Sequence, residues 1–204
     1  DLTMRLGYMG YVPSEIAEKL QVAYVFLIDS HVQGYYGTVS HNTKAVYTKY
    51  LGWYDGNPAN LNPLPPVESA QKYVEYMGGT EELVAKATKA YEEGDYRWVV
   101  QVMNHAVFAD PNNAEVRNLQ ADAFEQLGYQ SESGTWRNAY LTAARELRYG
   151  SLRIPASMGR QIAHAITIEQ LFDMIGVRFD PGKFEFGPCL LYTSPSPRDR
   201  TRYR

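Results

Sequence analysis

Apolar residues spaced three and four positions apart recur through most of the chain, and this pattern predicts a mainly α-helical protein. The spacing is clearest in the central part, where we expect helices over residues 66–77, 81–93, 95–109, 113–127 and 135–148. The breaks between these helices are short and rich in glycine, aspartate and asparagine. Because short connections join antiparallel neighbours, the pattern predicts a helical bundle.

The N-terminal part predicts shorter helices. Residues 1–22 indicate two of them, and the second has either Pro13 in its first turn or Ser14 as its cap. The apolar run at 23–28 fits a helix or a strand equally well.

A further helix is expected to begin at Ser40 or Asn42 and to end before Gly52. Its expected apolar stripe consists of Val46, Tyr47, Tyr50 and Leu51.

Gly94 and Gly128 stand at equivalent positions of a weak internal repeat, and each glycine is expected to end a helix. Ala106 and the DPNN turn at 110–113 fall where a tetratricopeptide-like (TPR-like) hairpin would place them. The repeat weakens in its second copy, where Tyr140 stands in the position of the small residue. The spacing therefore predicts a TPR-like helical domain.

Two boundaries divide the chain. Four prolines in the connector 56–66 cannot lie within one continuous helix, and a third segment begins near Pro155. In that segment, Thr167 and Gln170 fit a capping box that opens a short helix. The VRF and KFEF runs around a DPG turn predict strands of an α+β domain. Residues 188–204 break this pattern and resemble translated sequencing adaptor, so we expect them to be an adaptor-derived tail.

Composition excludes several classes of function. The formal net charge of −3 gives no electrostatic reason to expect nucleic-acid binding. Cys189 is the only cysteine, which rules out an intrachain disulfide and a cysteine-rich zinc site. No apolar run approaches the roughly 20 residues needed to cross a bilayer. The chain does not open with Met, so we expect it to start inside a longer protein.

The four histidines lack the spacings that place two ligands on one metal ion. We expect His105 and His164 to be core or interface residues and His31 to lie in a solvated turn.

His41 stands apart because of its neighbours in GYYGTVSHN, residues 34–42. Hydroxyl, imidazole and amide groups gather there at an expected helix N-terminus, which favours an anion such as sulfate, phosphate or carboxylate. The alternative is that Ser40 or Asn42 caps the helix while His41 is solvated.

Four stretches together resemble the alkylsulfatases, the zinc-dependent SDS-hydrolase group of the metallo-β-lactamase superfamily. They are GYYGTVSHNTKAVYTKYLGWYDGNPANLNPLPP, YVEYMGG, GDYRWVVQVMNHAVFADPNN and LQADAFEQLGYQSESGTWRNAYLTAARELR. The resemblance covers residues 1 to about 187. It implies that residues 1–55 end an αββα catalytic domain, residues 56–150 form the helical dimerisation domain, and residues 151–187 begin a sterol-carrier-protein-like domain.

The resemblance also implies a two-zinc site built on an H-x-H-x-D-H motif, two glutamates and a further histidine. That motif is absent from the chain, so we expect the ligands upstream of Asp1. His41 is then a candidate sulfate contact or proton donor to the leaving oxygen. Tyr35, Tyr36, Asn42 and Tyr54 are candidates to line the substrate pocket.

The implied function is hydrolysis of primary alkyl sulfates such as dodecyl sulfate, with this portion mainly providing dimerisation. The alternative is a stand-alone dimerisation or scaffold module without catalysis. The helical region is rich in large aromatic side chains, namely Trp98, Trp136, Tyr91 and Tyr140. We therefore expect a homodimer that buries part of this surface.

Overall fold

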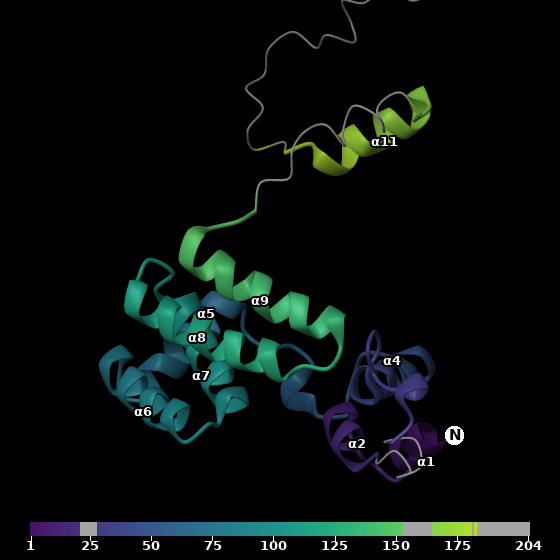
Figure 1. The fold of residues 1–204 in the computed structure, drawn as a ribbon. Coiled ribbons are helices and arrows are strands. Elements are labelled where there is room, and N and C mark those ends of the chain that lie inside the picture. Colours follow the sequence, from purple (N-terminus) through teal and green to yellow (C-terminus); the bar gives the residue numbers. More distant parts are fainter. Residues whose placement is uncertain (21–27, 153–164, 181, 183–204) are drawn as a thin grey trace, which may run out of the picture. The chain divides into compact units, whose positions relative to one another are not determined.

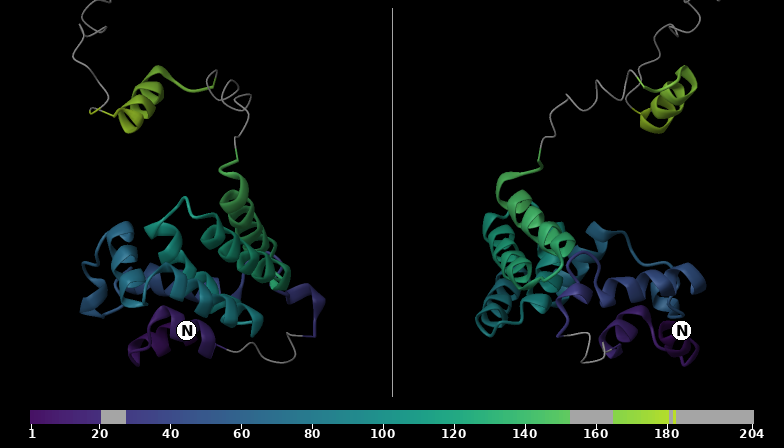
Figure 2. Two further views of the ribbon diagram at one scale, coloured as in Figure 1. Left: turned by 90° about the vertical axis from the view of Figure 1, so that its left-hand side faces the viewer. Right: turned by 45° about the vertical axis from the view of Figure 1, so that its right-hand side comes forward.

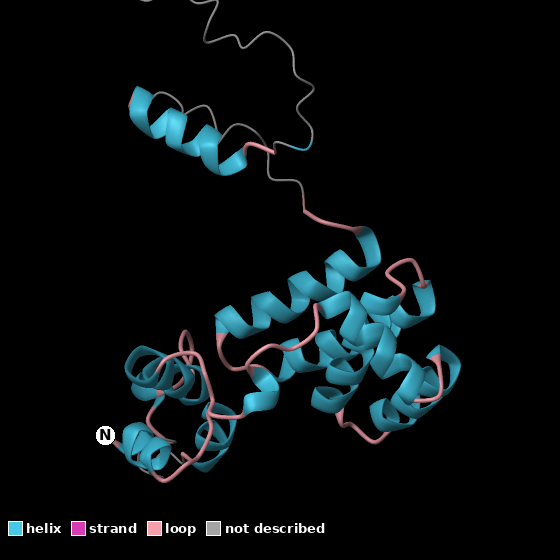
Figure 3. Cartoon of the chain, turned by 180° about the vertical axis from the view of Figure 1, so that it is seen from behind, coloured by secondary structure: helices cyan, strands magenta, loops and turns pink. Residues whose placement is uncertain are grey.

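The structure is a computed structural model that describes residues 1–20, 28–152, 165–180 and 182. The chain divides into two compact units, Asp1–Leu152 and Arg153–Arg204. Every regular element in the described ranges is a helix, as Figures 1 and 3 show. The prediction of a mainly α-helical fold is confirmed.

Three helices open the first unit: α1 (Leu2–Tyr8), α2 (Pro13–Lys19) and α4 (Val39–Leu51), all packed on one another. Pro13 occupies the first helical position of α2, which confirms the first of the two alternatives predicted from the sequence. The Glu15 carboxylate accepts a hydrogen bond from the Val12 N–H at 3.0 Å and so satisfies a free donor at the start of α2. Two 3₁₀ turns, Ser30–Val32 and Pro58–Asn60, complete this region.

Five helices form the bundle: α5 (Pro66–Tyr76), α6 (Thr80–Glu92), α7 (Tyr96–Ala109), α8 (Ala114–Gln130) and α9 (Gly134–Tyr149). Helix α7 packs on α5, α6 and α8, and α8 in turn packs on α9; Figure 2 shows this last pair side by side in both views. The core between them is apolar and consists of Val74, Leu83, Val84, Ala87, Val99, Val102, Met103, Ala106, Val116 and Ala123.

Side-chain caps explain where three of these helices begin. Asp95, Asn113 and Ser133 each accept hydrogen bonds from backbone N–H groups in the first turn of α7, α8 and α9. The predicted helix at 95–109 therefore starts one residue later than expected, because Asp95 serves as its cap.

The predicted start of α4 was wrong. The helix begins at Val39, and its cap is Thr38, whose Oγ1 accepts a hydrogen bond from the His41 N–H at 2.9 Å. The expected apolar stripe was only partly right, because Tyr47 is buried while Tyr50 and Leu51 are exposed.

The prediction that Gly128 ends a helix was also wrong. Gly94 has a φ of +83° and follows the end of α6 as expected, but α8 runs through Gly128 to Gln130. A Cβ at position 128 would lie 2.9 Å from the Cδ2 methyl of Leu141 on α9. Gly128 therefore allows α8 and α9 to approach closely, and the two glycines of the supposed repeat serve different purposes.

The second unit contains α11 (Ile168–Arg178), which begins with the predicted capping box of Thr167 and Gln170. The predicted VRF strand was wrong in part, because Val177 and Arg178 belong to this helix. The KFEF run, His164 and residues 23–27 lie outside the described residues. None of the described helices combines the length and apolarity that a membrane span requires.

Candidate functional site

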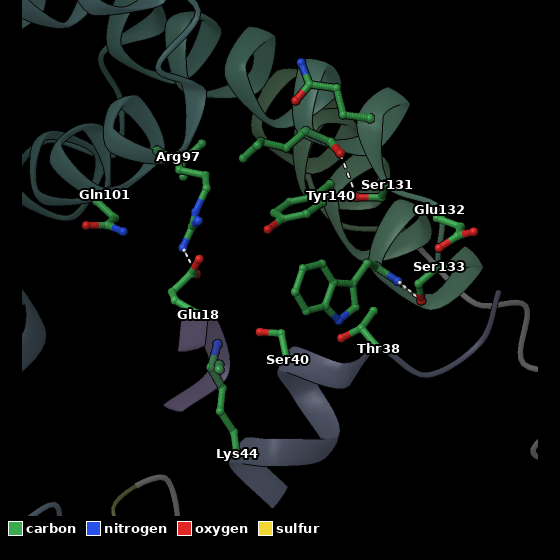
Figure 4. Close-up of a pocket in the computed structure, with 15 residues that line it drawn as sticks. Glu18, Thr38, Ser40, Lys44, Arg97, Gln101, Ser131, Glu132, Ser133 and Tyr140 are labelled. Atoms are coloured by element: carbon green, nitrogen blue, oxygen red, sulfur yellow. Dashed lines mark hydrogen bonds and ion pairs between the residues drawn. The ribbon is translucent and has the colours of Figure 1, made fainter. Parts of the chain in front are cut away.

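A pocket of about 500 Å³ lies between the N-terminal helices α2 and α4 and the bundle helices α7, α8 and α9 (Figure 4). Its walls combine hydroxyl, amide, charged and aromatic side chains. The lining consists of Ala17, Glu18, Thr38, Ser40, Lys44, Arg97, Val100, Gln101, Leu127, Gln130, Ser131, Glu132, Ser133, Trp136 and Tyr140.

The charges around this pocket balance. Arg97 Nη2 and Glu18 Oε1 form an ion pair at 2.9 Å across it, and Lys44 and Glu132 contribute one further charge of each sign. Both partners of the ion pair are largely exposed, so it contributes no more than about 1 kcal/mol. The pocket therefore offers hydrogen-bonding groups of both kinds without a field of one sign.

The five predicted site residues are absent from the lining of this pocket. The His41 side chain is exposed, with its ring edge-on to Trp136 at 6.4 Å between centroids. The side chain of Asn42 lies next to Gly37, where an added Cβ would be 3.3 Å from Asn42 Oδ1.

The tyrosines among these residues differ in burial. The side chains of Tyr35 and Tyr36 are exposed, whereas Tyr54 is half-buried and packs edge-on against Trp53 at 5.8 Å. Four of the five candidates thus share the short segment 34–42, and their roles in a substrate pocket stay predictions.

Of the other histidines, His105 and His31 belong to the described residues. His105 is half-buried on α7 and stacks on Tyr73 at 4.5 Å between ring centroids, as expected for a core or interface residue. His31 is exposed in a 3₁₀ turn, where its Nδ1 lies 3.1 Å from Asp29 Oδ1. The prediction that His31 lies in a solvated turn is confirmed.

A set of contacts that the sequence did not suggest joins the segment 34–42 to the start of α9. The carbonyl oxygen of Tyr36 accepts hydrogen bonds from Ser133 Oγ at 2.6 Å and from Thr135 Oγ1 at 2.7 Å. The carbonyl oxygen of Tyr35 accepts one from the Gly134 N–H at 2.7 Å. We call Ser133, Gly134 and Thr135 the α9 clamp. Its members lie nearly 100 positions from the tyrosines they hold, so no local pattern could have revealed it.

The four aromatic residues expected at a dimer surface are not equally exposed. Trp98 is 52% exposed, whereas Tyr91, Trp136 and Tyr140 are half-buried. Tyr91 packs edge-on against Tyr96 at 5.1 Å, and Trp136 against Tyr140 at 6.5 Å. Trp98 is therefore the member of this set with the most surface left for a partner.

The described residues do not fit a two-zinc site. Within those residues, no group of three or more histidine, cysteine, aspartate or glutamate side chains is arranged to hold a metal ion.

The fold is that of a helical bundle domain with three further helices packed before it. Residues 12–150 match the family described as alkyl sulfatase dimerisation, and the chain belongs to that family. The match begins upstream of the connector 56–66, and the predicted domain boundary at 55/56 stays a prediction.

Known relatives are sulfatases. The chain is 52% identical to the alkyl/aryl-sulfatase BDS1 of Saccharomyces cerevisiae over 185 residues, which are 91% of this chain and 29% of that protein. It is 47% identical to a linear primary-alkylsulfatase of Pseudomonas sp, covering 87% of this chain and 27% of the relative. It is 50% identical to an (R)-specific secondary-alkylsulfatase of Pseudomonas sp, covering 75% of this chain and 23% of the relative.

A solved structure agrees with this assignment. The stereoselective inverting sec-alkylsulfatase Pisa1 from Pseudomonas sp. superposes with a TM-score of 0.76 at 44% identity, covering 87% of this chain and 28% of that one. The chain thus spans less than a third of the length of these relatives. These relatives include both primary and secondary alkylsulfatases.

Proposed function

We propose that this chain is part of a sulfuric ester hydrolase that acts on primary alkyl sulfates such as dodecyl sulfate, and that its bundle holds two copies together as a homodimer. The observation that carries the proposal is the match of residues 12–150 to the alkyl sulfatase dimerisation family. The residues that bind the two zinc ions belong, in this proposal, to a part of the protein that precedes Asp1.

Within this proposal, His41 contacts the sulfate group or donates a proton to the leaving oxygen. Its ring is exposed at the first turn of α4, where backbone N–H groups and the helix dipole favour an anion. Tyr35, Tyr36 and Asn42 belong to the same segment, and with Tyr54 they are the proposed pocket residues.

Sulfate release by the complete protein tests the activity. The protein encoded by the reading frame around this chain is purified with zinc and given dodecyl sulfate and, separately, a secondary alkyl sulfate of equal chain length. We expect inorganic sulfate to form faster from dodecyl sulfate. Absence of sulfate from both esters would refute the hydrolase, and faster release from the secondary ester would refute the primary-ester preference.

The homodimer has its own test, centred on Trp98. This side chain borders an apolar hollow of about 160 Å³ lined also by Met77, Leu83, Ala87, Val102 and Lys86. Exposed tryptophans beside apolar pockets are frequent anchors of protein interfaces. Sedimentation equilibrium of the chain should show a dimer of the 23.2 kDa chain at micromolar concentration.

The variant Trp98→Ala should raise the dimer dissociation constant by at least about 10-fold, the loss expected of an interface anchor. Tyr149→Ala, which truncates an exposed tyrosine at the far end of α9, is the matched control and should leave the constant unchanged. A well-folded monomer at micromolar concentration would contradict the dimer.

A further inference from the structure

We propose that the α9 clamp positions the segment 34–42, and with it His41, for the reaction of the complete protein. Ser133 and Thr135 are then positioning residues that act through the backbone of Tyr36. This inference rests on the proposed function, because it assigns to the helical bundle a second task beside dimerisation.

The first argument is the number and direction of the hydrogen bonds. Two hydroxyl groups, Ser133 Oγ and Thr135 Oγ1, donate to the single carbonyl oxygen of Tyr36 and so occupy both of its lone pairs. The Gly134 N–H binds the carbonyl of the preceding residue, Tyr35. One hydrogen bond would let the segment pivot, whereas three bonds to two consecutive peptide groups fix its position and its orientation.

The second argument is burial. Ser133 is only 1% exposed, although its hydroxyl is polar, and its oxygen also caps α9 by accepting from the Trp136 N–H. The two hydroxyl oxygens lie 2.9 Å apart because both point at the same carbonyl, and each uses its single proton for that carbonyl. Buried polar groups that are fully hydrogen-bonded hold a unique geometry, because any displacement leaves a group unpaired in a dry environment.

The third argument is the path from Tyr36 to His41. The side chain of Asn42 packs against Gly37, and Thr38 caps the helix by accepting from the His41 N–H. Trp136, the residue after the clamp, lies edge-on to the His41 ring. Helix α9 therefore contacts the segment at its backbone on one side and at the His41 ring on the other.

The fourth argument is that the clamp stands on a firmly held helix. Arg148, near the end of α9, pairs with Glu125 at 2.7 Å and with Asp122 at 2.5 Å on α8. Arg117 on α8 donates to the Leu147 carbonyl through Nε at 2.6 Å. Functional groups are positioned best when rigid elements support them, and α9 meets that condition.

The test uses the complete protein and variants of the clamp. Thr135→Val removes one donor at an exposed position, and the pair Ser133→Ala with Thr135→Val removes both hydroxyls. Thr135→Ser keeps the donor and serves as the rescue. The control is Thr88→Val, because Thr88 donates to the Val84 carbonyl within α6, a helix that contributes nothing to the clamp.

We expect kcat for alkyl sulfate hydrolysis to fall about 3-fold in Thr135→Val and about 10- to 100-fold in the double variant. A displacement of about 1 Å at a reacting group can lower the rate by up to about 100-fold. We expect KM to change by less than about 2-fold, because the clamp acts on positioning for the reaction. Thr135→Ser and Thr88→Val should keep the wild-type kcat. A folded double variant with wild-type kcat would overturn the inference.

A spectroscopic measurement on this chain separates positioning from general destabilisation. The ring protons of His41 lie near the Trp136 ring, so their NMR chemical shifts report on that contact. They should move in the double variant and stay in Thr88→Val. A fall in kcat with unchanged His41 shifts would overturn positioning. If the wild-type complete protein hydrolyses no alkyl sulfate, the proposed function fails, and the His41 shifts still decide whether the clamp positions this segment.

Discussion

The two helical regions of the first unit are stabilised in different ways. The bundle α5–α9 has an apolar core of ten buried residues, whereas α1, α2 and α4 bury only Thr3, Ile16, Thr43 and Tyr47. Half of that smaller set is polar. The bundle is thus held by hydrophobic burial, and the N-terminal region depends more on polar contacts that attach it to the bundle.

Two such contacts stand out in the described residues. The Arg97–Glu18 ion pair is exposed and contributes little, whereas the clamp includes a buried hydroxyl and three short hydrogen bonds. The segment carrying His41 is thus bound to a helix that follows about 100 residues later.

Core truncation gives the largest effect that separates the two regions. Met103→Ala should lower the free energy of unfolding of the bundle by about 2–5 kcal/mol, because Met103 is fully buried and its loss leaves a cavity. Ile16→Ala removes a side chain that is equally buried, but in α2. We expect it to loosen the N-terminal region while the bundle keeps its stability.

Denaturant unfolding followed by hydrogen exchange measures the two regions separately. Met103→Ala should raise the exchange rates of the slowest-exchanging bundle amides, whereas Ile16→Ala should leave those rates unchanged. If Ile16→Ala destabilises the bundle as much as Met103→Ala does, the two regions form one cooperative unit and the comparison fails.

A smaller effect comes from the charges that hold α9 on α8. The hydrogen bond from Arg148 lowers the pKa of Glu125 below its ordinary value of 4.5. A carboxyl whose pKa is lowered by folding contributes stability that is complete above its unfolded pKa and is lost as the pH falls through the folded pKa. Arg148→Met should therefore cost about 1 kcal/mol at pH 7, and the difference from wild type should shrink below about pH 4.5.

Urea unfolding at pH 7 and pH 3 measures this difference. The control is Lys86→Met, which removes an exposed i,i+4 ion pair with Glu82 and should cost less than about 0.5 kcal/mol at either pH. A deficit for Arg148→Met that is the same at both pH values would show that lost packing, not the ion pair, causes it.

Helix positions in the bundle could be predicted from the sequence because local signals specify them. Apolar spacing, Asp95 and the DPNN turn each act within a few residues, and the structure confirms the helices they indicate. The start of α4 was missed because Thr38, Ser40 and Asn42 are all suitable caps, and the backbone conformation decided among them.

Gly128 shows where local signals fail. A glycine near an expected helix end reads as a terminator, but this one lies inside α8 because Leu141 of α9 occupies the space of a side chain. A contact between helices leaves no trace in the local pattern.

The candidate site shows the same limit. The sequence indicated the segment 34–42 through its own residues, His41 and the two tyrosines. It could not indicate Ser133 and Thr135, since their partner is a backbone carbonyl, which every residue has.

The most direct test of the account is hydrogen exchange at the amide of Gly134. Gly134 is the first residue of α9, so its N–H has no acceptor within the helix and is protected only by the Tyr35 carbonyl. Ala114, the first residue of α8, is exposed and has no acceptor for its N–H in the described part of the chain. After correction for intrinsic rates, we predict exchange at Gly134 at least about 100-fold slower than at Ala114. Equal rates would show that the bundle does not hold the His41 segment.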